Sequence, residues 1–337
     1  MKVLLIGGTG TISTAISRKV MEKGWELWHL NRGTRPEAVP AGVKTIHCDI
    51  KNEAECAAKL EGHSFDVVAD FIVFTPPEAE RAYRLFRGKT KQYIFIHTAS
   101  AYQKPLNHYK ITESTPRANP YWKYSRDKTA CEEFYMGKYR GEGFPVTIVL
   151  PSHTYNERGV PLGVHGDKGS WQIVKRMLDG KKVIIHGDGT SLWTMTYNHD
   201  FADGFIGLMG NIKAVGESVI ITSDESLTWN QIYKAIADAL NVPLNAVHIS
   251  SEFLAKAGEH YDFNGSLLGD KANSVVFDNS KLKRLVPGFT AKTRFDQGIK
   301  KVVEYMLSHK ECQVEDPEFD AWCDRIIAAR EKALESI

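Results

Sequence analysis

The chain has 337 residues, of which 42% are hydrophobic and 25% are charged, and its formal net charge is +2. Its length and composition are typical of a globular protein with one large or two modest domains. The nearly balanced charge gives no electrostatic reason to expect nucleic acid or an anionic membrane as a partner.

The cysteines are odd in number and scattered along the chain, without a Cys-x-x-Cys pair (Cys48, Cys56, Cys131, Cys312 and Cys323). This pattern predicts a reduced compartment, no disulfide framework and no structural metal site. The opening "MKVLLIGG" is too short for the apolar core of a signal peptide, and no later stretch reaches the length of a membrane span. We therefore expect a cytoplasmic location.

The first predicted element is a buried strand over residues 3–6, a continuous apolar run of the kind found in parallel sheets. Apolar residues then recur at helical spacing from Ile12 to Val20, and Gly24 ends the predicted helix. The turn between strand and helix contains three glycines, Gly7, Gly8 and Gly10. Such a turn brings bare backbone N–H groups against a pyrophosphate, with the helix dipole behind them.

The turn departs from the usual dinucleotide fingerprint only at its third glycine position, which is Ser13. A serine there permits slightly looser packing of helix on strand and leaves the phosphate turn intact. The predicted cofactor contacts from this segment are Gly7, Thr9, Gly10, Thr11 and Ile12.

The second predicted strand, "WELWHL", ends at Asn31-Arg32-Gly33, where a dinucleotide fold that selects NAD usually has an acidic residue. Here the acid is absent, and Arg32 is followed by Arg35. A guanidinium suits a 2′-phosphate because its fork binds two phosphate oxygens, so Asn31 and Arg32 favour NADP(H) over NAD(H). The alternative is a solvated arginine in a loop.

Two further strands follow in chain order. "TIHCDI" leads to Asp49-Ile50, and "FDVVADFIVF" carries Phe71 and Ile72 at its carboxyl end, where ligands of open α/β sheets bind. We predict cofactor contacts from all four of these residues, and we assign no role to Asp70.

The fifth strand, "KQYIFIHTASAY", runs into Thr98, Ser100 and Tyr102, and a helix containing Tyr124 and Lys128 comes next. A sixth strand then ends at Pro151, ahead of His153. Alternating strands and helices of this length predict an α/β fold of the Rossmann type, with a doubly wound parallel sheet. A tyrosine and a lysine four residues apart share one helix face, but taken alone the pair favours ordinary packing over catalysis.

The order and spacing of these motifs together resemble the extended short-chain dehydrogenases/reductases, that is, the NAD-dependent epimerase/dehydratase family typified by UDP-galactose 4-epimerase. The matching segments are Gly7-Gly8-Thr9-Gly10, Asp49-Ile50, "FIHTASAY", the Tyr124-to-Lys128 element, "LPSHTYN" and "HGDGTSLWTMTYNHDFADG". The resemblance covers nearly the whole chain. It implies a dinucleotide-binding domain over residues 1–155 with returning segments near 196–226, a smaller substrate domain over 156–195 and 227–310, and a helical extension over 311–337.

The resemblance also implies roles for individual residues. Tyr124 would be the general acid/base, Lys128 would lower the pKa of the phenol and bind the nicotinamide ribose, and Thr98 would hydrogen-bond the reacting oxygen. A free phenol has a pKa near ~10 and is a poor base at neutral pH, so it needs a nearby positive charge. Cofactor contacts would also come from Tyr124, Lys128, Pro151 and His153, and substrate contacts from Ser100, Tyr102, His153 and Trp193.

Several departures from the family put a nucleotide-sugar substrate in doubt. Family members hold the substrate diphosphate with two arginines, but this chain has Trp193 at one position and no arginine in "GSLLGDKANS" at the other. Trp193 could offer its flat face to a sugar ring, and an equally good interpretation is that it packs in the core. The family's asparagine after the sixth strand is His153 here, and the acid pair of the dehydratases is replaced by Ala99-Ser100.

These observations predict an NAD(P)-dependent enzyme that transfers a hydride at a secondary alcohol or ketone of a sugar-like small molecule. An epimerase would keep its cofactor bound, whereas an NADPH-dependent carbonyl reductase would exchange it at every turnover. A third alternative is a non-catalytic NADP-binding or RNA-binding relative, since relatives with similar substitutions include chloroplast stem-loop RNA-binding proteins. We expect a small-molecule partner, neither nucleic acid nor membrane, and, from the family, a homodimer through the Tyr124 helix.

Overall fold

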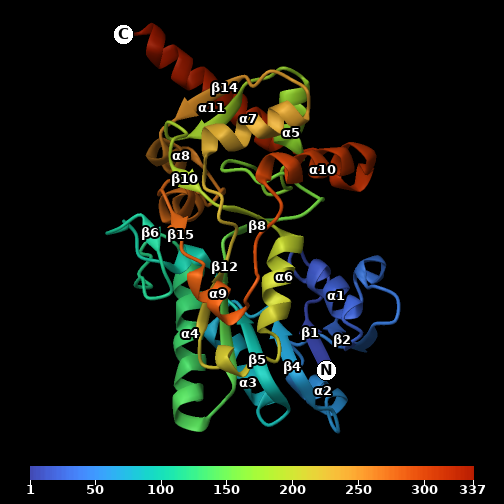
Figure 1. Cartoon of the computed structure of the whole chain (residues 1–337). Helices are drawn as coiled ribbons and strands as arrows, with labels where there is room; N and C mark the ends of the chain where they lie inside the picture. The colour runs from blue at the N-terminus through green and yellow to red at the C-terminus, as the bar shows by residue number, and fades with distance from the viewer.

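Seven parallel strands form the central sheet of the computed structural model, which describes residues 1–337 (Figure 1). The strands lie in the order β12-β7-β5-β4-β1-β2-β3, which is the doubly wound arrangement that the sequence predicted. Their bounds are β1 Lys2–Ile6, β2 Glu26–Asn31, β3 Lys44–His47, β4 Phe65–Asp70, β5 Thr90–Ile96, β7 Val146–Pro151 and β12 Ser218–Ile221.

Alternate residues of these strands feed two separate apolar cores, one on each face of the sheet. Val3 and Leu5 face one core, and Leu4 and Ile6 face the other. The first core is covered by α1 Ser13–Glu22, α6 Asn198–Leu208 and α9 Ser280–Leu285. The second is covered by α2 Glu53–Lys59, α3 Pro76–Phe86 and α4 Lys123–Glu142.

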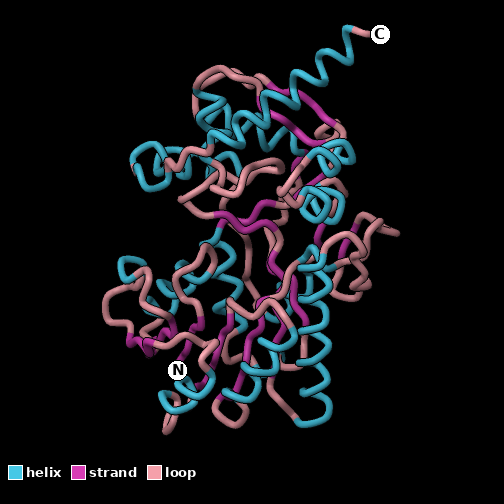
Figure 2. Tube along the Cα trace, turned by 180° about the vertical axis from the view of Figure 1, so that it is seen from behind, coloured by secondary structure: helices cyan, strands magenta, loops and turns pink.

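A second lobe lies beyond the carboxyl ends of the strands, and Figure 2 shows the chain crossing to it at several places. Its helices are α5 Trp171–Leu178, α7 Trp229–Ala239, α8 Ser251–Ala257, α10 Phe295–Ser308 and α11 Pro317–Glu335. Its strands pair as β9 Val183–His186 with β14 Ala246–Ile249, and β10 Leu192–Trp193 with β13 Leu227–Thr228. A π-helix over Asn264–Lys271 faces the sheet lobe.

Two short strand pairs join the lobes. β8 His153–Tyr155 pairs with β11 Met195–Tyr197, and β6 Lys110–Ile111 pairs with β15 Val276–Phe277. The segment after β15 returns to the sheet lobe, because Leu282 and Phe289 pack in the core that α1 and α6 cover. The domain boundaries drawn from the sequence placed this segment in the substrate domain.

The structure contains one disulfide, whereas the cysteine pattern predicted no disulfide framework. Cys48, directly after β3, and Cys56 in α2 form a disulfide, with their Cα atoms 6.0 Å apart. The turn between β3 and α2 brings the two residues together, which their scattered positions in the sequence did not reveal. Cys131, Cys312 and Cys323 are free. None of the helices combines the length and the apolar character needed to cross a membrane.

Candidate active site

The glycine turn after β1 has the geometry of a phosphate-binding loop. Gly7 has a φ of +79°, which favours glycine, and a Cβ there would lie 2.6 Å from Ile72 Cγ2. A Cβ on Gly8 would lie 2.5 Å from the buried His29 ring, so this glycine lets the turn sit directly on β2. At Gly10 a Cβ would meet only Ser13 Oγ, at 3.4 Å, which leaves the backbone open to a ligand.

A cavity of about 450 Å³ lies beside this turn and brings together most of the predicted adenosine contacts. The predicted residues that line it are Gly7, Thr9, Gly10, Asn31, Arg32, Asp49, Ile50 and Ile72. Thr34, Arg35, Lys51 and Arg81 line it as well, and no acidic side chain stands at the end of β2. The residues present therefore fit the adenosine half of a dinucleotide, and the carboxylates of Asp49 and Glu78 line the cavity together with these cations.

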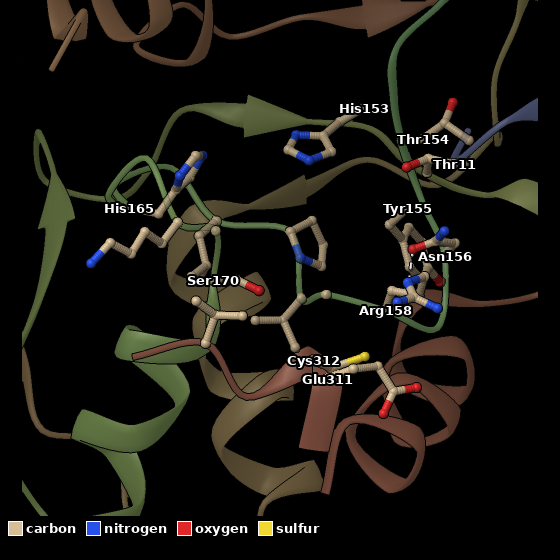
Figure 3. A pocket seen from close by; sticks show the side chains of 17 residues that line it. Thr11, His153, Thr154, Tyr155, Asn156, Arg158, His165, Ser170, Glu311 and Cys312 are labelled. Atoms are coloured by element: carbon tan, nitrogen blue, oxygen red, sulfur yellow. Dashed lines mark hydrogen bonds between the residues drawn. The ribbon is translucent and has the colours of Figure 1, made fainter. Parts of the chain in front are cut away.

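Two further cavities continue from the glycine turn towards the second lobe. One, of about 640 Å³, shares Thr9, Gly10 and Arg35 with the adenosine cavity and adds Arg18. The next, of about 380 Å³, is reached through Thr11 and is shown in Figure 3. The three cavities form a path from β2 across the glycine turn to the interface between the lobes.

Tyr124, in the first turn of α4, lies beside the loop that follows β5. Its phenol lies near the hydroxyl of Thr98, and its ring packs near Trp122 and Phe74, with centroids 5.1 and 6.3 Å away. Burial raises the pKa of Tyr124 to about 12, although the nearby Thr98 hydroxyl acts in the opposite direction. The structure therefore brings the predicted acid/base and its hydroxyl partner together.

Lys128 stands one turn further along α4, but the structure does not show the effect predicted for it. Its Nζ donates to the carbonyl oxygens of Val73 at 2.6 Å and Ile96 at 2.7 Å. Burial lowers the pKa of Lys128 to about 8. Because these carbonyls hold the ammonium, the environment of Tyr124 is dominated by burial, and its pKa is raised instead of lowered.

The hydroxyl of Thr98 belongs to a buried chain of hydroxyl groups. Thr98 Oγ1 lies 3.0 Å from Ser100 Oγ, which lies 2.7 Å from Ser125 Oγ. The N–H of Ser100 also donates to Thr98 Oγ1, at 3.2 Å. Ser100, predicted as a substrate contact, is 4% exposed, and its hydroxyl and N–H contact the hydroxyl of Thr98.

Sequence reasoning missed the pair of residues that holds Thr98 from its other side. The N–H of Thr98 donates to His97 Nδ1 at 2.6 Å, and His97 Nε2 lies 3.1 Å from the carboxylate of Glu132 in α4. Burial lowers the pKa of His97, and the nearby His97 and Arg117 hold the pKa of Glu132 at about 2 despite burial. A neutral imidazole with its proton on Nε2 satisfies both contacts. The sequence signal for this pair was His97, a histidine directly before the predicted catalytic residue Thr98.

The other predicted substrate residues divide into two groups. His153 lines the cavity of about 380 Å³ and points into it together with His165 (Figure 3). Burial lowers the pKa of His153 to about 3, and Lys271 and His165 act in the same direction. Tyr102 and Trp193 instead lie in the apolar core: Tyr102 is fully buried, and Trp193 packs on Trp229 with centroids 6.0 Å apart.

Besides Tyr124 and Lys128, three predicted cofactor residues line none of the cavities described above. Ile12 and Phe71 pack on the core under α1 and α6, where the Phe71 ring is 5.9 Å from Phe205. Pro151 ends β7 as a buried residue. Phe71 and Pro151 lie at strand ends, where successive residues face opposite sides of the sheet, and the pattern alone does not tell which of them reaches a ligand.

The model of the NAD dependent epimerase/dehydratase family matches residues 3–83 and 79–221 of this chain. Among characterised relatives, 2'-dehydrokanamycin reductase of Streptomyces kanamyceticus is 24% identical over 86% of this chain and 80% of that protein. The chloroplast stem-loop binding protein of 41 kDa b of Arabidopsis thaliana is 26% identical over 72% of this chain and 64% of that protein.

Solved structures share the fold over nearly the whole length. Pal from Bacillus thuringiensis superposes with a TM-score of 0.73 at 20% identity, covering 91% of this chain and 99% of that one. UDP-glucuronic acid 4-epimerase from Bacillus cereus, in complex with UDP-glucuronic acid and NAD, superposes with a TM-score of 0.72 at 17% identity, with the same coverage.

Proposed function

The chain belongs to the NAD-dependent epimerase/dehydratase family of enzymes, and we propose that it transfers a hydride between NADP(H) and a secondary alcohol or ketone of a sugar-like small molecule. The observation that carries the proposal is the placement of Tyr124 near Thr98 and next to Phe74, a residue that lines the cavity of the glycine turn. A bound nicotinamide would supply or accept the hydride.

The chain's own residues account for the proton in this proposal. Tyr124 gives a proton to the oxygen of a ketone being reduced, or takes one from an alcohol being oxidised, and Thr98 donates a hydrogen bond to the same oxygen. The lobe interface shields both groups from water, and that burial raises the pKa of the phenol. Lys128 holds the carbonyl oxygens of Val73 and Ile96, which fixes the strand ends on either side of the site.

The cations around the adenosine cavity support NADP(H) as the cofactor and an exchanging reductase as the reaction. Arg32, Arg35 and Arg81 line that cavity, and each can bind phosphate oxygens. The relative from Streptomyces kanamyceticus is itself named a reductase. The alternative is an epimerase, which uses the same hydride transfer but keeps its cofactor bound. The fold shared with UDP-glucuronic acid 4-epimerase is compatible with this alternative.

The geometry of the second lobe supports a substrate without a nucleotide diphosphate. Trp193 occupies the core where the family pattern has an arginine, and the π-helix provides no guanidinium. The cavity at the lobe interface is lined by His153, His165 and Ser170, which hydrogen-bond hydroxyls well, and also by the cations Arg158 and Lys168.

A binding protein without turnover is the competing proposal, and the chloroplast stem-loop binding protein is the reason to keep it. The balanced charge of the chain favours a small molecule over RNA. A cytoplasmic location and a homodimer through α4 remain further parts of the proposal.

The test follows deuteride from labelled NADPH into a panel of keto sugars by mass spectrometry, with NADPH binding measured separately by titration calorimetry. We expect Tyr124→Phe to lose at least 100-fold in transfer rate and to bind NADPH within twofold of the wild type. Tyr109→Phe, at an exposed tyrosine, is the matched control and should change neither quantity. Full transfer by Tyr124→Phe, or no binding of either nicotinamide cofactor by the wild type, would overturn the proposal.

A further inference from the structure

Asn119 lies between the loop of Thr98 and the start of α4, and its side-chain amide donates to two distant segments. Nδ2 donates to the carbonyl oxygen of Ser100 at 2.6 Å and to that of Gly269 at 2.6 Å. Ser100 belongs to the buried hydroxyl chain of Thr98, whereas Gly269 belongs to the π-helix of the second lobe. One amide therefore spans the interface between the lobes.

The same side chain also orders the residues that lead into α4. Its Oδ1 accepts the N–H groups of Tyr121 at 3.0 Å and Trp122 at 3.3 Å. An amide has two N–H groups and two lone pairs, and these four bonds use all of them. Asn119 is 4% exposed, so its loss leaves buried carbonyl and N–H groups without partners.

The π-helix is shaped to approach this point closely. A Cβ on Gly265 would collide with the Trp122 indole. A Cβ on Gly269 would lie 3.2 Å from Tyr121 Cβ and 3.3 Å from both Asn119 Oδ1 and Trp122 Cβ. The two glycines thus allow the backbone of the π-helix to rest on the residues ahead of Tyr124.

The far end of the π-helix is held just as firmly by the body of the second lobe. The carbonyl oxygen of Lys271 accepts Trp229 Nε1 and Ser191 Oγ, each at 3.1 Å, and lies 3.1 Å from His186 Nε2. Hydrogen bonds therefore connect the π-helix both to the second lobe and to the segment that leads into α4. Asp270, within the π-helix, is close enough to Tyr124 for its charge to raise the pKa of the phenol.

We propose that Asn119 is a positioning residue: it clasps the π-helix to the loop of Thr98 and to the first turn of α4, so that docking of the second lobe sets the relative positions of Thr98 and Tyr124. The inference rests on the proposed function, in which both groups must reach the same reacting oxygen. A displacement of about 1 Å in such a pair costs on the order of 100-fold in rate.

The first measurement needs no substrate. Hydrogen–deuterium exchange of the peptide containing Thr98 and Ser100 is compared in the wild type, Asn119→Ala and Gly269→Ala. We expect both variants to exchange at least tenfold faster there, although Gly269 lies in the other lobe. The matched control is Asn211→Ala, whose Nδ2 donates to Leu285 O at 2.8 Å and whose Oδ1 accepts Lys213 N at 3.0 Å, far from the site. Unchanged exchange in Gly269→Ala would overturn the inference.

The second measurement separates positioning from a merely structural role. For the keto sugar of the panel that accepts deuteride fastest, we expect kcat of Asn119→Ala and Gly269→Ala to fall at least tenfold, with the KM for NADPH within twofold. The double variant should be no slower than the slower single variant, because both changes break one contact. Additive losses, or an equal loss in Asn211→Ala, would contradict the inference.

A replacement variant and a separate readout cover the case in which Asn119→Ala fails to fold. If Asn119→Ala does not fold, Asn119→Asp retains acceptor oxygens for Tyr121 and Trp122 and lacks both donors, so it should show the same slow turnover. The proposed function fails separately, on NADPH binding and on Tyr124→Phe, whereas the exchange measurement reports on the clasp alone.

Discussion

Arg32 illustrates how one side chain sets cofactor choice at the residue scale. It follows β2, lines the adenosine cavity, and occupies the position after the one where NAD-selective folds carry an acid. We expect Arg32→Ala to weaken NADPH binding about tenfold, which corresponds to the loss of one guanidinium–phosphate contact, and to leave NADH binding within twofold. Titration calorimetry with both cofactors measures this, with Arg87→Ala, outside the cavity, as control. Equal weakening of both cofactors would contradict it.

His29 shows how the floor of the glycine turn depends on pH. The ring is fully buried under Gly8, its Nε2 lies 2.9 Å from Ser17 Oγ, and burial lowers its pKa to about 4. An unfolded histidine has a pKa near ~6.5, so between these values the unfolded chain binds the proton more readily than the folded one. The stability contributed by neutral His29 is therefore complete above about pH 6.5 and is lost as the pH falls towards 4.

The corresponding prediction concerns His29→Gln, which has no titrating ring. Over this pH range, His29 should account for about 2–3 kcal/mol of the loss in the free energy of unfolding. Urea unfolding of wild type and variant at pH 7.5 and 4.5 measures the difference. We expect a shallower pH dependence in the variant, and identical slopes would show that His29 does not contribute.

At the scale of elements, α6 is tied to the segment ahead of α10 by a single carboxylate. The oxygens of Asp200 accept the N–H groups of Lys292 at 3.1 Å and Thr293 at 2.9 Å, and Asp200 is 4% exposed. Asp200 belongs to the Asp-Phe-Ala block that resembles the family motif, and the structure gives it this anchoring role.

Asp200→Ala should lower the free energy of unfolding by about 2–4 kcal/mol, because two buried backbone N–H groups lose a charged acceptor. Asp203→Ala on the same helix is the control: its ion pair with Lys19, at 2.9 Å, is partly exposed, so we expect less than about 1 kcal/mol. Denaturant unfolding measures both changes. A cost for Asp203→Ala as large as that for Asp200→Ala would contradict the argument.

Elements with a strong local signal were predictable from the sequence. The apolar runs of β1, β4 and β7 identified strands of the central sheet. The order of motifs predicted one site for Thr98, Tyr124 and the glycine turn, and the structure places Tyr124 next to Phe74, which lines the adenosine cavity. The π-helix was not predictable: "NGSLLGDK" contains two glycines and no clear periodicity, and its conformation depends on contacts with Asn119, Trp122 and Trp229. The alternation of side chains at strand ends explains why Phe71 was assigned to the ligand and packs in the core.

At the scale of the whole molecule, the site is assembled from parts that lie far apart in the chain. The glycine turn, the loop of Thr98 and α4 come from the sheet lobe, whereas His165 and the π-helix come from the second lobe. The electrostatics of the site come from burial at this interface, since burial is the leading cause of the shifted pKa values of Tyr124, Lys128 and His153. No single segment contains the chemistry.

The interleaving of the two lobes also limits how such an enzyme can be changed by recombination. The chain leaves the sheet after β7, returns for α6 and β12, leaves again for α7, and returns once more for α9 before α10 and α11. A new specificity could therefore not be grafted as one cassette, since several splices would have to match at once. Diversification within this architecture is expected to proceed through point substitutions and loop insertions that face the cleft, with the crossing segments left intact.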